Sequence, residues 1–190
     1  MKSNITIKNI FAAFLVIGAL GLISCNNETD SKKIAEKSNE ALSDEKESDA
    51  DFLVSAAEIN LEEIKLGELA QINGMNADVK ELGKMMQTEH NNALKDLEAL
   101  AAKKNIIIPT MLTEDGQKAY KKLIDKTGLD FDKDYCDMMV KGHEKAIHKF
   151  EKASTEASDP DIQMWASSML PALRMHLDHS VACKNKCDNM

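Results

Sequence analysis

The 190-residue sequence has few of the residues that break or interrupt helices. It contains only 8 glycines and 3 prolines, and aromatic residues make up 4% of the chain. Alternation of apolar and polar residues, which a half-buried strand requires, is also missing, and apolar residues instead recur at three- and four-residue spacing. These absences exclude a mainly β-sheet fold, and the helical spacing predicts an all-α protein.

Basic residues are outnumbered by acidic ones. The chain has 24 Lys and Arg against 32 Asp and Glu, and its net charge is −8. Binding to nucleic acid needs clustered Lys and Arg that displace counterions, so we expect no nucleic-acid partner. A Gly-x-Ser-x-Gly nucleophile motif and a phosphate-binding glycine loop are both absent. The sequence therefore predicts no reaction, and it gives no indication of a protein partner.

The first 24 residues have the composition of an export signal. Lys2 and Lys8 precede an apolar run over residues 10–23. This run of about 14 residues is shorter than the roughly 20 that a membrane-spanning helix needs. It ends in Leu22-Ile23-Ser24-Cys25, which resembles the bacterial lipobox. We therefore expect a signal peptide over residues 1–24, lipidation of Cys25 and a protein tethered to a membrane by its lipid.

The residue after the lipobox bears on location. Asn26 follows Cys25, and this resembles lipoproteins that are passed on to the outer membrane. We expect a cell-envelope protein at the outer membrane or the periplasmic face. Loss of the two lysines in residues 1–24 would change the net charge from −8 to −10.

Residues 26–50 are rich in Asn, Glu, Asp, Ser and Lys and have hardly any apolar side chain. Such a segment cannot bury enough surface to offset its ordering entropy. We therefore predict a lipidated cysteine and disordered tether over residues 25–50, followed by one domain over residues 51–190.

The helical pattern predicts four long helices in that domain. They cover about 51–73, 77–104, 132–157 and 160 onward, with Gly74, Asn76, Asn105 and the pair Asp159-Pro160 as boundary signals. A short helix from Thr113 to about 126 is expected to end at Gly128, and Pro171 is expected to kink the last helix. Two antiparallel pairs joined by a long connection predict a ferritin-like four-helix bundle with one crossover.

Four polar residues interrupt the apolar stripes, one on each long helix: Glu63, His90, His143 and His176. Their spacing from apolar neighbours predicts that all four point inward. A rise of about 1.5 Å per residue places His143 and His176 nearly level, and Glu63 and His90 within about one and a half turns of each other. Three imidazoles and a carboxylate suit zinc, copper or iron, so these four residues form a candidate metal site.

The residue pattern argues against one type of metal chemistry and leaves one alternative to that site open. The Glu-x-x-His pairs of di-iron bundles are missing, which disfavours ferroxidase or oxygenase chemistry. The same four residues also suit a hydrogen-bonded polar core. A cofactor-free structural or partner-binding bundle is therefore the alternative to a metal-binding protein.

A second cluster lies at the C-terminus, where His179, Cys183 and Cys187 follow one another at four-residue spacing. These residues are secondary candidates for a metal site, and a disulfide between the two cysteines is the alternative. Cys136 is predicted to be a buried free thiol.

Several stretches together resemble a known bacterial family. They are Ala56-Ala57-Glu58, residues 63–70, Glu89-His90, residues 135–143 and residues 170–176. Over about residues 51–182 the chain resembles DUF4142, a domain of unknown function that is often labelled an outer-membrane protein and is grouped with the ferritin-like superfamily. The resemblance implies a ferritin-like bundle of unassigned activity.

Overall fold

A computed structural model describes residues 30–190, and every regular element in that range is an α-helix. The predicted signal peptide, Cys25 and Asn26 lie outside the described residues. The prediction of an all-α fold is confirmed for the described range. The six helices are α1 (Ser31–Asn39), α2 (Asp44–Asn73), α3 (Ala77–Lys104), α4 (Glu114–Leu123), α5 (Gly128–Glu156) and α6 (Pro160–Asp188).

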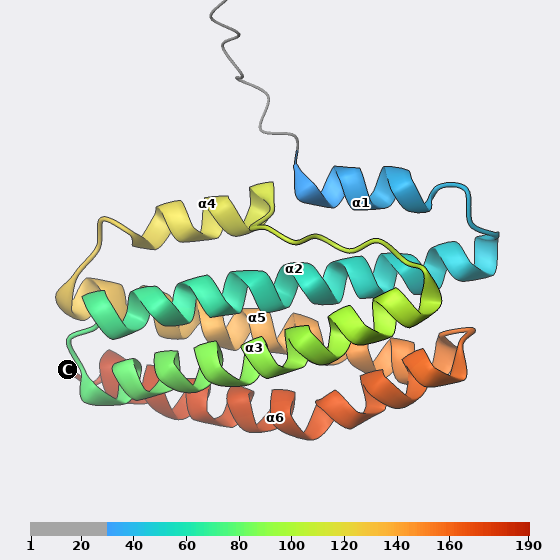
Figure 1. Cartoon of the computed structure of the whole chain (residues 1–190). Helices are drawn as coiled ribbons and strands as arrows, with labels where there is room; N and C mark the ends of the chain where they lie inside the picture. Colours follow the sequence, from blue (N-terminus) through green and yellow to red (C-terminus); the bar gives the residue numbers. More distant parts are fainter. Residues whose placement is uncertain (1–29) are drawn as a thin grey trace, which may run out of the picture.

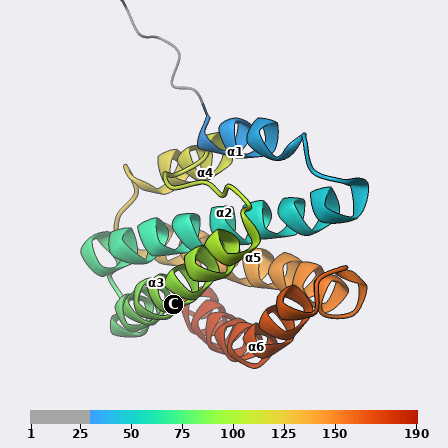
Figure 2. The same cartoon turned by 45° about the vertical axis from the view of Figure 1, so that its right-hand side comes forward.

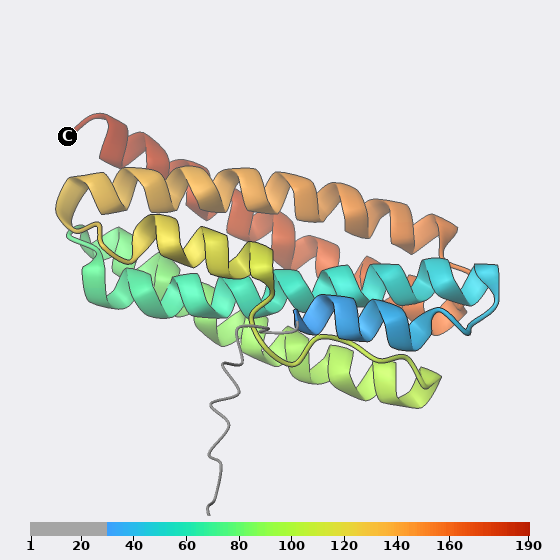
Figure 3. The same cartoon turned by 90° about the horizontal axis from the view of Figure 1, so that it is seen from above.

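The four long helices pack as two hairpins. α2 lies mainly against α3, and α5 lies mainly against α6, while α2–α5 and α3–α6 contacts join the two hairpins into a helical bundle (Figure 1). The same four helices lie side by side when the molecule is viewed from above (Figure 3). Helices α1 and α4 lie on one side of the bundle next to α2 (Figure 2). None of the helices within residues 30–190 combines the length and apolarity needed to cross a membrane.

The predicted helix boundary signals act as expected at several sites. The side chains of Asn76, Thr113 and Asp159 accept hydrogen bonds from the first-turn backbone N–H groups of α3, α4 and α6. Asn105 takes a left-handed conformation and ends α3. α6 continues through Pro171, and Figure 1 shows this helix bowed along its length.

The predicted tether is wrong for the part that the structure describes. Residues 31–39 form α1, and α2 begins at Asp44 instead of residue 51. The segment is held by long-range hydrogen bonds and not by an apolar stripe. Ser31 donates to the carbonyl of Met111 at 2.8 Å, and the Asn39 amide donates to Ile107 O and accepts from Ile107 N. These bonds attach α1 to the α3–α4 connection.

The predicted role of Gly128 is also wrong. The short helix α4 already ends at Leu123, and Gly128 is the first residue of α5, which starts four residues earlier than the predicted Asp132. Gly128 has φ +65°, a conformation that costs glycine little. It therefore turns the chain into α5.

Each hairpin holds the turn of the other through a buried aspartate. Asp49 of α2 accepts hydrogen bonds from the backbone N–H groups of Ser158 and Asp159, in the α5–α6 turn. Asp132 of α5 accepts them from Met75 and Asn76, in the α2–α3 turn. Both carboxylates are almost completely buried. The two hairpins are therefore fixed in register by reciprocal contacts.

Helices α2 and α3 approach closely where two glycines face each other. A Cβ atom on Gly67 would lie 2.5 Å from the carbonyl oxygen of Gly83, and one on Gly83 would lie 2.8 Å from the carbonyl oxygen of Gly67. Any larger residue would push the two backbones apart. The glycines thus set the separation of the first hairpin.

The apolar core is divided into two clusters along the bundle. One contains Leu53, Leu97, Phe150 and Ile162, and the other contains Leu66, Met86, Phe131 and Tyr135. On each long helix a short stretch of buried polar residues separates the two clusters. That polar layer contains the candidate metal centre.

Candidate metal centre

Three imidazoles from three different helices meet in the middle of the bundle. His90 of α3, His143 of α5 and His176 of α6 are each at most 3% exposed. Their ring centroids are 5.3–5.7 Å apart, and one ring nitrogen of each lies within 4.8 Å of the other two. The three histidines therefore form a group that could hold a metal ion.

The hydrogen bonds of His143 and His176 fix which nitrogen carries the proton. Nδ1 of His143 lies 2.9 Å from the carbonyl oxygen of Met139, and Nε2 of His176 lies 2.8 Å from a carboxylate oxygen of Glu89. Both oxygens can only accept, so both nitrogens donate. The remaining nitrogens, Nε2 of His143 and Nδ1 of His176, then carry lone pairs, and they lie 3.3 Å apart.

His90 is oriented in the same way. Its Nδ1 lies 2.9 Å from Oδ1 of Asn60, whose amide nitrogen donates to the carbonyl of Ala56 at 2.8 Å. The amide orientation leaves Oδ1 as an acceptor, so Nδ1 of His90 is protonated. Its Nε2 is buried and has no hydrogen-bond partner among the described residues. This lone pair is therefore free.

Burial keeps all three rings neutral near pH 7. Desolvation lowers the pKa of His90 well below its usual value, and the neighbouring His143 and His176 lower it further. Desolvation also lowers the pKa of His143 to about 4, although the hydrogen bond that His143 donates to the Met139 carbonyl opposes the shift. The pKa of His176 is lowered by burial, although Glu89 opposes the shift. Neutral imidazole is the form that binds transition metals.

Glu63, the fourth predicted ligand, lies behind the imidazole cluster. Its side chain is buried, and its Oε1 is 3.9 Å from Nδ1 of His143, the nitrogen committed to Met139. The other oxygen, Oε2, has no hydrogen-bond partner in the part of the chain that the structure describes. Desolvation, followed by the charge of Glu62, raises the pKa of Glu63 well above its usual value. The structure thus brings the three histidines together and places Glu63 beside only one of them.

A cavity of about 330 Å³ reaches the histidine cluster from one side. It lies between α2, α3 and α6, and its wall includes Asn60, Glu89, His90, Trp165, Met169 and His176. The indole N–H of Trp165 is buried and has no hydrogen-bond partner within residues 30–190. A metal ion, or a small ligand bound to it, therefore has a path to two of the three imidazoles.

Two residues of the site escaped the sequence reasoning. Asn60 lies in the buried stripe of α2, four residues after Ala56, and its polarity at that position was the available signal. Glu89 is partly exposed at 38% of its side chain and directly precedes His90. Nothing in its spacing distinguishes Glu89 from a surface acid, because its partner His176 is 87 residues away.

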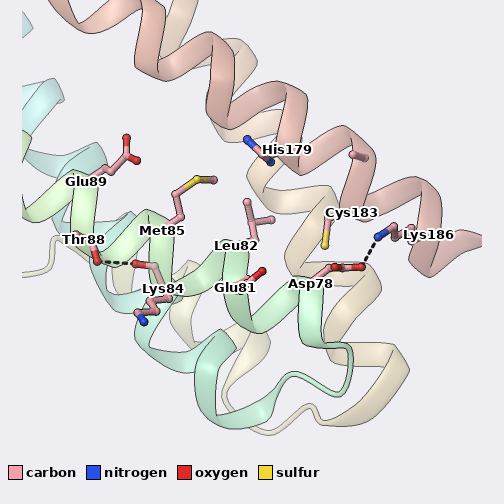
Figure 4. A pocket seen from close by; sticks show the side chains of 11 residues that line it. Asp78, Glu81, Leu82, Lys84, Met85, Thr88, Glu89, His179, Cys183 and Lys186 are labelled. Carbon is pink, nitrogen blue, oxygen red and sulfur yellow. Dashed lines mark hydrogen bonds and ion pairs between the residues drawn. The ribbon is translucent and has the colours of Figure 1, made fainter.

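The C-terminal candidates separate into two groups. Cys183 and Cys187 are buried and join Cys136 of α5, and the three sulfur atoms lie within 4.8 Å of one another. All three are free thiols, as predicted for Cys136, and the Cys183–Cys187 disulfide is not formed. His179 is exposed and lines a groove between α3 and α6 together with Cys183 (Figure 4). We call Cys136, Cys183 and Cys187 the thiol cluster; it also could hold a metal ion.

The thiol cluster had a signal in the sequence. Cys136 lies seven residues before His143, and Cys183 lies seven residues after His176. Since α5 and α6 are antiparallel and the two histidines are level, equal offsets in opposite directions place the two cysteines at the same depth.

Comparison with known families identifies the chain. A family profile for a domain of unknown function, DUF4142, matches residues 32–182. The chain therefore belongs to the DUF4142 family, and the match begins within the segment that the sequence predicted to be a tether. Neither the curated proteins nor the solved structures contain a match to this chain.

Proposed function

We propose that this protein is a lipid-anchored, metal-binding protein of the bacterial cell envelope. Its ferritin-like bundle binds one divalent transition-metal ion through His90, His143 and His176, with zinc, copper and iron as the candidate metals. The proposal rests on three ring nitrogens, one from each histidine, that converge in the core. In each ring the other nitrogen donates a hydrogen bond to an oxygen of the protein, so the converging nitrogen keeps its lone pair.

This arrangement matches what metal-binding histidines require. A ligating imidazole commonly donates its second N–H to a carbonyl or carboxylate, which fixes the tautomer and ring orientation. Asn60, Met139 and Glu89 supply that acceptor for His90, His143 and His176 respectively.

The metal-free site is also unfavourable by itself. Two lone pairs facing each other at 3.3 Å need a positive charge between them, and burial disfavours an extra proton on either ring. A cation that accepts both lone pairs removes this conflict. Three protein ligands leave a coordination position open, and the cavity beside Trp165 and Met169 provides room for a small ligand there.

The anchoring part of the proposal rests on the lipobox-like residues Leu22 to Cys25 and on Asn26. Attachment through lipid at the outer membrane or the periplasmic face would place the metal site in a compartment where incoming metal is first met. We infer a role in binding or buffering metal in the envelope.

Elemental analysis of the purified full chain tests the metal site. After loading with Zn(II), Cu(II) or Fe(II) and removal of excess metal, we expect His143→Ala to retain one ion fewer per chain than the wild type. His148→Ala is the matched control, since His148 is an exposed histidine of the same helix. Circular dichroism of both variants checks that the helices persist.

A second variant protects the test against misfolding. Asn60→Ala leaves all three ligands in place and removes only the acceptor of His90, so it should weaken binding without abolishing it. If the wild type, His143→Ala and His148→Ala retain equal amounts of all three metals, the proposal is wrong. The cofactor-free structural or partner-binding bundle would then be the remaining function.

A further inference from the structure

The thiol cluster lies apart from the histidine cluster, toward the end of the bundle formed by the α2–α3 turn and the C-terminus of α6. Cys183 is seven residues from His176, which is about 10 Å along a helix. The cysteines pack within the apolar cluster that contains Leu82, Met86 and Tyr135. The proposed histidine site makes no use of them.

Packing of the apolar core does not by itself explain why three buried thiols lie within 4.8 Å of one another. A single buried cysteine acts as a small apolar side chain, and a disulfide would use only two of the three. The neighbouring Cys136 thiol lowers the pKa of Cys183, even though burial opposes that shift. The neighbouring Cys183, together with burial, raises the pKa of Cys136.

We propose that Cys136, Cys183 and Cys187 bind a single Cu(I) ion through their three sulfur atoms. Soft thiolates favour Cu(I), which is stable with two or three ligands. Each thiol that becomes a ligand releases its proton to solvent, and the copper stays Cu(I) throughout, so no electron is transferred.

The donor set favours Cu(I) over zinc. Structural zinc sites are almost always four-coordinate, whereas no fourth His, Asp or Glu among the described residues joins this group. The carboxylates that influence the cysteines are already engaged. Asp132 accepts from two backbone N–H groups, and Asp78 pairs with Lys186 at 2.6 Å.

A groove connects the thiol cluster with the surface. It lies between α3 and α6, has a volume of about 490 Å³, and has Cys183 in its wall (Figure 4). Met85 and His179 line the same groove and offer a thioether and an imidazole, both of which bind copper. An ion can therefore pass from solvent toward Cys183 without unfolding of the bundle.

Titration of the reduced full chain with Cu(I) under anaerobic conditions tests the proposal, with bathocuproine disulfonate as the competing chelator. We expect one tightly bound Cu(I) per chain whose nearest neighbours are sulfur in X-ray absorption spectra. Cys136→Ser and Cys187→Ser nearly preserve volume, and each should lower the Cu(I) affinity more than about tenfold. The control His148→Ala should bind as the wild type does.

Three outcomes would overturn this inference. The first is equal Cu(I) affinity in the wild type and Cys136→Ser. The second is a loss of affinity in His179→Ala as large as in the cysteine variants, which would indicate a four-ligand site. The third is Zn(II) with sulfur nearest neighbours that remains bound at the thiol cluster in the presence of equimolar Cu(I). Because the nearest neighbours are sulfur here and nitrogen in the histidine site, failure of one site is distinguishable from failure of the other.

Discussion

Nε2 of His143 and Nδ1 of His176 lie 3.3 Å apart, and neither nitrogen has a proton to share, because the protons of both rings are committed to Met139 and Glu89. Two acceptors at this distance repel each other in a buried site. An ion bound between the two nitrogens would relieve this repulsion, so the proposed metal should stabilise the bundle.

The first prediction is that metal stabilises the fold. Zn(II) at about 100 times its dissociation constant should raise the free energy of unfolding by about 2.7 kcal/mol, because it binds the native state alone. Thermal unfolding with Zn(II) and with EDTA measures this difference. It should persist in His148→Ala and disappear in His143→Ala; an equal shift in both variants would contradict the assignment of the ligands.

The second prediction concerns Asn60, which orients His90 without touching the ion. Asn60→Ala should lower metal affinity by about 10- to 100-fold, the usual effect of losing an acceptor behind a ligating histidine. Competition with a chelator of known affinity measures the change. Asn91→Ala is the control, since the Asn91 amide bonds only to Gln87 of its own helix. Unchanged affinity in Asn60→Ala would show that Asn60 does not position the ring.

The third prediction concerns Gly67, where replacement of a helical glycine by alanine should lower the stability of the protein instead of raising it. Gly67→Ala should destabilise the protein by about 1–3 kcal/mol, because the new Cβ would meet the backbone of α3. An unhindered glycine in a helix normally gains about 1 kcal/mol from this change. Gly142→Ala is the control, since its Cβ would approach only the Glu63 side chain, at 3.2 Å. Denaturant unfolding measures both, and a stabilised Gly67→Ala would contradict the close approach.

The fourth prediction concerns the buried aspartates that hold the turns. Asp132→Ala should cost at least about 1.5–3 kcal/mol, since it leaves the N–H groups of Met75 and Asn76 without their charged acceptor. Asp137→Ala on the same helix removes only a surface pair with Lys141 and should cost less than about 1 kcal/mol. Urea unfolding measures both variants. An equal loss of unfolding free energy in both would contradict the stabilisation of the α2–α3 turn by Asp132.

The fifth prediction follows from Glu62, whose pKa is raised to about 7 by burial and then by the charges of Glu58 and Asp115. Between pH 4.5 and 7 the folded chain holds a proton that the unfolded chain has lost. The free energy of unfolding should therefore fall as pH rises through this window, by up to about 3 kcal/mol. Urea unfolding in EDTA at several pH values measures it. Glu62→Gln should flatten the decrease, whereas exposed Glu81→Gln should not.

The sequence predicted the long helices well because their apolar periodicity and boundary residues act locally. Asn76, Thr113 and Asp159 cap helices as expected, and the three core histidines meet because each interrupts an apolar stripe. The segment containing α1 was missed because Ser31 and Asn39 are held by partners 68–80 residues away. Composition carries no information about such bonds.

For Glu63 the sequence predicted burial but not the direction of the carboxylate. Its helical position correctly predicted a buried side chain, and the structure places that side chain beside His143. Periodicity gives the face of a helix, however, and does not give the direction of a carboxylate relative to a ring. Only the hydrogen bond of His143 to Met139 decides that Glu63 faces the nitrogen with the proton.

The hydrogen bonds of Asp49 and Asp132 also have a consequence for the order in which the chain can fold. The α2–α3 hairpin is synthesised first, yet the carboxylate that satisfies its turn belongs to Asp132, 57 residues after Met75. In a nascent first hairpin these two backbone donors bond only to water until α5 arrives. Since the imidazoles span both hairpins, the proposed metal site can form only when the chain is complete, and a product truncated before α5 would lack both the acceptor of its first turn and two of the three imidazoles.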